Sequence, residues 1–243
     1  MKQVTIIGSG NAFNTDGRAH AAYLLEHSGG EILLMDCGAT TLYRLQAERF
    51  DANRLSGLLL THFHGDHFGG LPFLLLQLDL VCRRQDAFVI LGPPGVEAAC
   101  RQLIDLCYPA FGFHFALEFI EVLSETSFRG FDIQAFPIHH RPESAGYRVS
   151  GPAGRTIAFS GDSAWDEALF DLVRGVDLAL VELTMEKQSE PPVDHVAWDQ
   201  VEREGHRLEA KRIVFTHIYD DLERRVLKSN FGAVARDGLT FTL

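Results

Sequence analysis

The sequence has no hydrophobic run that approaches the roughly 20 residues of a membrane-spanning helix. Its longest apolar runs, at 58–60 and 71–76, are much shorter and are typical of a buried core. The opening residues MKQVTIIGSG also lack the apolar segment of a secretory signal. We therefore expect a cytoplasmic protein with no membrane partner.

Cysteine is scarce as well. The 243 residues include four cysteines, and no two of them form a C-x-x-C pair. This distribution argues against a small scaffold held together by disulfides and favours reduced thiols, in agreement with a cytoplasmic location. We interpret Cys37, which follows Asp36, as a small buried residue.

Basic residues are fewer than acidic residues. The chain has 22 lysines and arginines against 33 aspartates and glutamates, which gives a formal net charge of −11. Because lysine and arginine hold nucleic-acid backbones, this balance argues against a general nucleic-acid-binding surface, although it leaves room for a local basic patch. Carboxylates that ligate divalent metals would add to this formal negative charge, and the bound ions would partly cancel it.

The chain also lacks repeats, low-complexity tracts and Ser/Gly/Pro-rich linkers, so we predict a single domain over residues 1–243. Strand-like runs alternate with amphipathic segments along its length. We predict strands at 4–7, 22–25, 32–36, 58–61, 88–91, 131–138, 146–149, 156–160, 178–182 and 213–216. We predict helices at 41–50, 71–80, 96–107, 165–174, 198–208 and 221–228. This order is typical of a layered α/β fold.

The segment THFHGDHFGG, at 61–70, concentrates three histidines and an aspartate at the end of a predicted strand. Imidazole and carboxylate groups are ligands of Zn²⁺, and a catalytic zinc site keeps one position open for water. In an extended segment His62 and His64 point to the same side. A turn at the following glycine would present Asp66 and His67 in another direction. This arrangement fits two adjacent metal ions better than one tetrahedral ion.

Four residues cannot complete two metal sites, so we expect further ligands from later strand ends. The segments FPIHH, TIAFSGD and RIVFTH each deliver ligand-type side chains after an apolar strand: His139 and His140, Asp162, and His217. Taken singly, a histidine or aspartate after a strand is more often a cap or a packing group. Three repetitions of the same arrangement favour a shared site at the strand ends.

These motifs resemble the metallo-β-lactamase superfamily and, within it, ribonuclease Z and its phosphodiesterase-like relatives. The resemblance lies in the histidine motif with the following Leu71-Pro72, in Gly146-Tyr147-Arg148, in Ser160-Gly161-Asp162 and in Thr216-His217. It implies an α/β fold with four αββα layers and a site for two divalent metal ions. The histidine and carboxylate ligands suit Zn²⁺ best, with Mn²⁺ or Fe as alternatives.

The resemblance also implies how the ligands divide. One ion would be held by His62, His64 and His140, the other by Asp66, His67 and His217, with Asp162 bridging both. His140 is the implied ligand because it lies six residues before the glycine of the Gly-Tyr-Arg segment. Its neighbour His139 would point to the opposite strand face, and we interpret it as a supporting or packing group.

Three residues are candidates for catalysis. Two ions roughly 3.5–4 Å apart can hold a bridging hydroxide, which Asp66 would orient as well as ligating a metal. Glu182, in an E-x-T segment, and His195 match a pair that lies near the leaving group in ribonuclease Z. A carboxylate bonded to imidazole favours the protonated histidine, which could donate a proton. The alternative is that His195 caps the helix predicted from 198 and that Glu182 is an ordinary charge at a strand end.

The chain departs from ribonuclease Z between Tyr147 and Asp162, where that family carries a long arm that grips tRNA. Here the segment is RVSGPAGRTIAFSG, which is compatible only with a short hairpin. A second departure follows His217, where Ile-Tyr-Asp-Asp replaces a serine-containing turn. Together with the acidic charge, these features lead us to expect no stable tRNA binding and a small-molecule or short phosphodiester substrate.

We therefore predict a dinuclear metal-dependent hydrolase, a phosphodiesterase that uses a metal-bridging hydroxide on a small or single-stranded phosphodiester. Hydrolysis of a lactone, ester or thioester and tRNA 3′-processing remain alternatives within the same fold. A metal-binding accessory protein of a biosynthetic pathway is the alternative without catalysis. A homodimer is expected by analogy alone.

Overall fold

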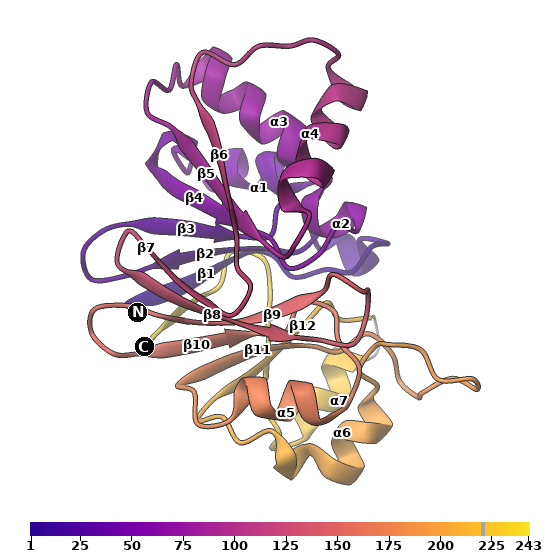
Figure 1. Ribbon diagram of the computed structural model, residues 1–243. Helices are drawn as coiled ribbons and strands as arrows, with labels where there is room; N and C mark the ends of the chain where they lie inside the picture. Colours follow the sequence, from indigo (N-terminus) through magenta and orange to yellow (C-terminus); the bar gives the residue numbers. More distant parts are fainter. Residues whose placement is uncertain (220–221) are drawn as a thin grey trace.

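The computed structural model describes residues 1–219 and 222–243, and within them two sheets of seven strands stack face to face (Figure 1). The first sheet has the order β14 (Thr240–Thr242), β1 (Gln3–Gly8), β2 (Ala22–Glu26), β3 (Ile32–Met35), β4 (Leu55–Leu59), β5 (Phe88–Gly92) and β6 (Leu117–Glu121). The second has the order β13 (Ala233–Val234), β12 (Ile213–Thr216), β11 (Leu178–Glu182), β10 (Thr156–Phe159), β9 (Ala145–Ser150), β8 (Phe131–Pro137) and β7 (Glu125–Phe128).

Both sheets are mixed. Strands β3 to β6 run parallel in the first sheet, and β10 to β13 run parallel in the second. The remaining pairs are antiparallel. Because the carboxyl ends of parallel strands meet at one edge, loops that follow β4, β10, β11 and β12 are brought together there.

Helices cover the outer faces. The chain forms α1 (Thr41–Ala47), α2 (Gly65–Phe68), α3 (Leu71–Leu76), α4 (Val96–Cys107), α5 (Glu167–Val173), α6 (Trp198–Glu204) and α7 (Leu222–Lys228). The first four lie on the side of the first sheet and the last three on the side of the second (Figure 1). The expected four-layer αββα arrangement is thus confirmed.

The burial pattern of the strands explains these layers. A central apolar cluster between the sheets includes Leu33, Leu59 and Tyr147. A second cluster joins the first sheet to its helices, and a third joins the second sheet to α5, α6 and α7. All residues of β3, β4 and β11 are buried, because these strands are covered on both faces. Such strands have nearly continuous apolar runs rather than an alternation of apolar and polar residues. No helix among the described residues combines the length and apolar character needed to cross a bilayer.

Several predicted elements match closely, including the helix at 96–107 and the strands at 178–182 and 213–216. The predicted strand at 58–61 was wrong in its bounds, since β4 spans Leu55–Leu59 and the chain leaves the sheet before the histidine motif. The predicted helix at 71–80 ends at Leu76 and continues as a π-helical turn. The last predicted helix begins at Leu222 within the described residues, and residue 221 lies outside them, as does the end of the Ile-Tyr-Asp-Asp segment.

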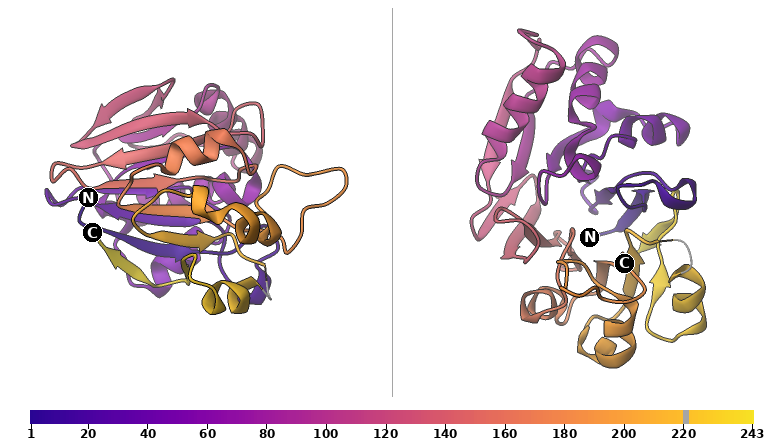
Figure 2. Two further views of the ribbon diagram at one scale, coloured as in Figure 1. Left: turned by 90° about the horizontal axis from the view of Figure 1, so that it is seen from below. Right: turned by 90° about the vertical axis from the view of Figure 1, so that its right-hand side faces the viewer.

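Two loops of the second sheet differ in length. Strands β9 and β10 pair antiparallel with only residues 151–155 between them, which confirms the short hairpin. The segment between β11 and α6 instead forms a long loop that projects from the sandwich, drawn in orange in Figure 2.

Candidate metal centre

The residues predicted as ligands come from four strand ends and one short helix. They are His62 and His64 after β4, His140 after β8, Asp162 after β10, His217 after β12, and Asp66 and His67 on α2. Because the two sheets stack face to face, these strand ends meet at the edge of the sandwich where α2 lies (Figure 1). The structure brings all seven side chains together.

Four of these side chains form a first cluster. Ligand-type atoms of His62, His64, His140 and Asp162 all lie within 4.8 Å of one another. His140 Nε2 is 3.1 Å from His64 Nδ1 and 3.6 Å from Asp162 Oδ2. His62 Nε2 is 3.8 Å from the same carboxylate oxygen. The atoms thus converge on one small volume.

A second cluster shares the same aspartate. It consists of Asp66, His67, Asp162 and His217, again within 4.8 Å of one another. Asp162 Oδ1 lies 3.1 Å from His67 Nε2 and 3.4 Å from His217 Nε2. Asp66 Oδ2 lies 3.6 Å and 3.2 Å from the same two nitrogens. One oxygen of Asp162 therefore faces each cluster, which is the placement that a bridging carboxylate requires.

The hydrogen-bonding state of these atoms fits bound metal ions. His62 Nε2, His67 Nε2 and Asp162 Oδ1 are buried, and none of them has a hydrogen-bond partner among the described residues. Buried polar atoms are normally paired, so three unpaired atoms that face one another need an explanation. Divalent cations accept the lone pairs of imidazole and carboxylate groups, and the donor set suits zinc.

The carboxylate of Asp36 orients two of the candidate ligand histidines, His67 and His62, through hydrogen bonds to their Nδ1 sides. His67 Nδ1 donates to Asp36 Oδ2 at 2.7 Å. His62 Nδ1 donates to the Thr61 hydroxyl at 3.0 Å, and that hydroxyl donates to Asp36 Oδ2 at 2.9 Å. These bonds fix the tautomer of both rings and leave each Nε2 free to bind a metal.

The carboxylate of Glu182 orients two other histidines, His195 directly and His217 through Thr184. His195 Nδ1 donates to Glu182 Oε1 at 2.8 Å. His217 Nδ1 donates to the Thr184 hydroxyl at 2.8 Å, and that hydroxyl donates to Glu182 Oε2 at 2.6 Å. The fully buried Asp36 thus supports one histidine of each cluster, and the fully buried Glu182 supports His217 of the second cluster together with His195. From the sequence, no role was assigned to Asp36, Thr61 or Thr184, although the D-C-G segment contains the first and the E-x-T segment the last.

The backbone at the centre is held in conformations that ordinary residues avoid. Asp36 and His217 have φ of 55° and 57°, in the left-handed region that residues other than glycine rarely adopt. Gly161, which directly precedes Asp162, has φ of 59°. Such local strain is concentrated at functional sites, where the surrounding structure maintains it.

The electrostatics of the centre also favour bound cations. Burial and the neighbouring histidines lower the pKa of His62 well below its ordinary value, so its ring is neutral, as a metal ligand must be. Burial opposes the ionisation of Asp66, but hydrogen bonding and nearby histidines outweigh it and lower the pKa of that carboxyl. Burial also opposes protonation of His67, yet Asp162 and Asp36 raise its pKa well above the usual range. The buried carboxylates thus attract positive charge, which a divalent ion supplies.

His195 and His139, which were also considered from the sequence, lie in different places. His195 borders the centre, because its ring is 4.8 Å from the His140 ring and stacked at 5.9 Å on the His217 ring. Burial opposes its protonation, but the hydrogen bond and charge of Glu182 raise the pKa of His195 to about 9. His139 instead turns outward and contacts Asp166.

The structure contradicts the alternative explanations for His195 and Glu182. The N-cap of α6 is Ala197, so the interpretation of His195 as the helix cap was wrong. Glu182 is fully buried rather than an ordinary charge at a strand end. His139 lies apart from both ligand clusters, where its partner Asp166 caps α5.

The fold and the centre agree with a comparison to known families. Residues 32–218 match the model of the Beta-lactamase superfamily domain. The chain belongs to the beta-lactamase superfamily. The resemblance that the histidine motif and its partners indicated is thereby confirmed.

Within the superfamily, relatives of this chain include proteins named Ribonuclease Z. One from Mycolicibacterium paratuberculosis is 30% identical over 203 residues, covering 77% of this chain and 71% of the relative. One from Pyrococcus horikoshii is 31% identical over 147 residues, covering 60% of this chain and 47% of the relative. The chain spans about half the length of this and two further ribonucleases Z. These relatives place it in the ribonuclease Z-like branch of the superfamily.

A solved structure supports the same assignment over almost the whole chain. The short form of human tRNase Z has a TM-score of 0.76 and 25% identity, and the match covers 98% of each chain. The β-sandwich and its surrounding helices are therefore those of the superfamily.

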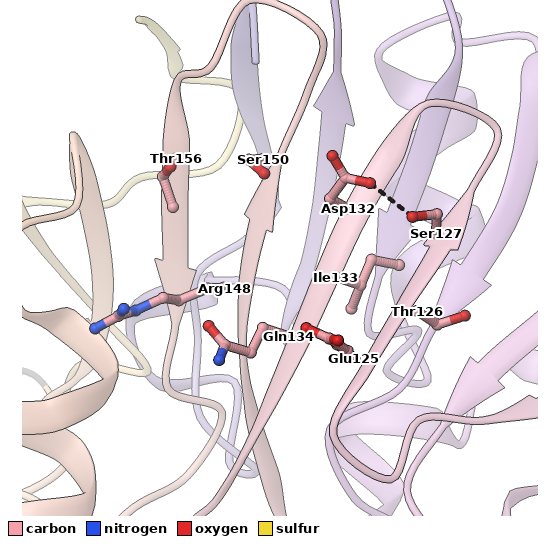
Figure 3. A pocket seen from close by; sticks show the side chains of 9 residues that line it. All are labelled: Glu125, Thr126, Ser127, Asp132, Ile133, Gln134, Arg148, Ser150 and Thr156. Atoms are coloured by element: carbon pink, nitrogen blue, oxygen red, sulfur yellow. Dashed lines mark hydrogen bonds between the residues drawn. The ribbon is translucent and has the colours of Figure 1, made fainter.

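A cavity of about 710 Å³ lies elsewhere, on β7 to β10 (Figure 3). Its lining is polar and includes Glu125, Asp132 and Arg148, and Ser127 donates to Asp132 at 2.7 Å. None of the predicted ligands lines it. This cavity is therefore separate from the histidine centre.

Proposed function

We propose that this protein is a dinuclear metal-dependent phosphodiesterase that acts on a small or short single-stranded phosphodiester. The observation that carries the proposal is the position of Asp162, whose two oxygens face two separate groups of histidines. The unpaired buried nitrogens of His62 and His67 support it. The seven predicted ligands would hold two ions, with zinc as the metal that best suits them.

Divalent ions in this centre would polarise a phosphoryl oxygen and lower the pKa of water. The chain's own residues supply orientation. The contacts of Asp66 to His67 and His217 use Oδ2, which leaves Oδ1 to accept a hydrogen bond from the attacking water. Asp36 holds the rings of His67 and, through Thr61, His62, and Glu182 holds the ring of His217 through Thr184, so that their Nε2 atoms point into the centre.

His195 is proposed to give a proton to the leaving oxygen. Glu182 accepts from its Nδ1, which leaves Nε2 as the donor toward the substrate. The side chain is 23% exposed, so it borders both the centre and the solvent from which a substrate arrives. Its contacts with the rings of His140 and His217 place it beside both metal clusters. This position suits a general acid near the leaving group.

A phosphodiester is proposed because the relatives are named as ribonucleases. A small substrate is proposed because residues 151–155 form a short turn and the net charge is −11, both of which disfavour a grip on tRNA. We keep one domain over residues 1–243, a possible homodimer and a cytoplasmic location as predictions. The core shared by the two sheets supports the single domain.

A panel of substrates tests the proposal. The metal-loaded protein is assayed with an aryl phosphodiester, a lactone, a thioester and a tRNA precursor. Turnover of the phosphodiester, lost in Asp66→Asn and without tRNA cleavage, is the expected result. Turnover of the lactone or thioester alone would shift the assignment to that chemistry, and efficient cleavage of the tRNA precursor would shift it to tRNA processing. Absence of any turnover with both metals bound would indicate the accessory role.

A further inference from the structure

Two exposed aromatic side chains stand together near the metal centre. Phe13 is 77% exposed and Tyr219 is 47% exposed, although they come from opposite ends of the chain. Their ring centroids are 6.4 Å apart, and their planes are inclined by 79°. Large aromatic side chains are usually buried, and an exposed group of them is a common feature of binding surfaces.

The pair lies at the rim of the centre. Tyr219 is two residues after the predicted ligand His217, so its Cα lies within about 8 Å of the ligand's Cα. The backbone N–H of His217 donates to the carbonyl of Ser9 at 2.9 Å, which joins the Phe13 loop to the same ligand. In Figures 1 and 2 the indigo loop after β1 lies beside the segment that follows β12.

Hydrogen bonds hold the Phe13 loop in place. Asp237 accepts from the backbone and hydroxyl of Ser9 at 2.9 Å and 2.8 Å, and from the backbone of Ala19 at 2.8 Å. Asn11 Oδ1 accepts from the backbone N–H of Phe13 at 3.0 Å. The loop is therefore ordered by polar contacts at its base, and the Phe13 ring is displayed rather than used to anchor it.

We propose that Phe13 and Tyr219 form an aromatic subsite that stacks the nucleobase of a nucleotide substrate while its phosphoryl group occupies the metal centre. This inference rests on the proposed phosphodiesterase function. Aromatic rings bind the π-face of any base, so the subsite selects for a base without selecting among bases. The two ring planes are nearly perpendicular, so the rings do not stack face to face on each other. A ring face is thereby left for a third planar group.

The observations favour a single base over a long nucleic acid. A chain of net charge −11 with a short β9–β10 hairpin offers little to hold many phosphates. One aromatic pair beside one metal centre matches one base and one phosphoryl group. The shared chemistry is a base linked to a phosphoryl group, whether in a free nucleotide or at the end of a short strand.

Equilibrium binding to the metal-loaded protein tests the subsite without requiring turnover. Adenosine 5′-monophosphate and ribose 5-phosphate are titrated by calorimetry, since they differ only in the base. We expect the nucleotide to bind at least about tenfold more tightly to the wild type. This ratio should fall toward one in Phe13→Leu and Tyr219→Leu, which keep bulk but lose the ring, and should persist in Tyr219→Phe.

The control is Leu106→Ala, which truncates a 79% exposed apolar side chain on α4 and should leave the ratio unchanged. Metal content and circular dichroism confirm that each variant is folded and loaded. A short single-stranded oligonucleotide in the same titration distinguishes a free nucleotide from a strand end by which of the two binds more tightly. In either case the preference should depend on both rings.

The outcomes separate this inference from the function on which it rests. Equal or absent binding of the nucleotide and the sugar phosphate overturns the subsite, even if phosphodiesters are hydrolysed. Base-selective binding that depends on Phe13 and Tyr219, without phosphodiester turnover, supports the subsite and overturns the proposed hydrolysis. A change of oligomeric state in the leucine variants with an unchanged binding ratio assigns the rings to subunit contact and overturns the subsite.

Discussion

Thr184 connects a buried carboxylate to one side of the metal centre, and Thr184→Val removes this connection while almost preserving the shape of the side chain. In the structure the hydroxyl accepts from His217 Nδ1 at 2.8 Å and donates to Glu182 Oε2 at 2.6 Å. The variant leaves His217 without the bond that fixes its tautomer. It also leaves one oxygen of Glu182 without its donor.

The size of the effect follows from these two bonds. Loss of the partner of a buried polar group costs about 1–3 kcal/mol. Loss of the group that supports a metal-binding histidine lowers metal affinity about 10- to 100-fold, or about 1.4–2.7 kcal/mol. The two ranges agree, so we expect Thr184→Val to weaken the ion held through His217 by one to two orders of magnitude. Thr184→Ser keeps the hydroxyl and should restore most of the affinity.

Competition with a chromogenic chelator measures the two ions separately. The matched variant is Thr61→Val, which breaks the corresponding relay from Asp36 to His62. Each valine variant should weaken one ion and spare the other. Because the Thr184 effect acts through His217, it should disappear in a His217→Ala background. Equal weakening of both ions by Thr184→Val, or full additivity with His217→Ala, would refute the relay.

The remaining predictions concern the reaction and the fold. Asp66→Asn should lower phosphodiester turnover at least about 100-fold with the fold retained, since the attacking water loses its acceptor; near-normal turnover with circular dichroism unchanged would remove Asp66 from that role. His195→Ala should slow the hydrolysis of alkyl phosphodiesters, whose leaving groups need a proton, about 10²- to 10⁴-fold, and that of activated aryl phosphodiesters far less. Equal losses for both substrates would exclude proton donation by His195. Removal of metal by a chelator should lower the melting temperature by roughly 10 °C, because the bound ions stabilise the folded state alone; an unchanged melting temperature would indicate that the buried carboxylates need no cation.

Most residues of the two clusters could be predicted because their signals are local, whereas the choice of His140 over His139 came from the family resemblance. Each ligand-type side chain follows an apolar strand, as in FSGDS around Asp162 and FTHI around His217. The alternation of strands and helices then predicts parallel strands, whose carboxyl ends meet at one edge of the sheet. The helix at 96–107 was equally accessible, because its apolar residues repeat with helical spacing.

The elements that were missed have weak or non-local signals. Strands β6 and β7 are partly exposed sheet edges whose residues include charges, so their alternation is blurred. The predicted strand at 58–61 began too late because Ser56 and Gly57, which belong to β4, interrupt its apolar pattern. Its last residues lie beyond β4, although Leu60 still donates to Leu91 of β5 at 2.9 Å.

The supporting residues of the centre depend on tertiary contacts. Asp36 is 25 positions from Thr61 and 31 from His67. The parallel pairing of β3 with β4 brings Thr61 to it, and the position of α2 at the end of β3 brings His67. The aromatic pair of Phe13 and Tyr219 is even further apart in the chain. No periodicity within a segment indicates such a contact. The sequence therefore indicates the candidate ligands better than the groups that orient them.

Metal content measured beside activity tests the account most directly. The metal-free protein is titrated with Zn²⁺ while bound metal per chain and phosphodiester turnover are followed together, with Asp162→Asn as the variant that disturbs both clusters. The account predicts full activity at two ions per chain and the loss of both tight ions in the variant. Full activity at one ion per chain, or two tight ions retained by Asp162→Asn, would contradict it.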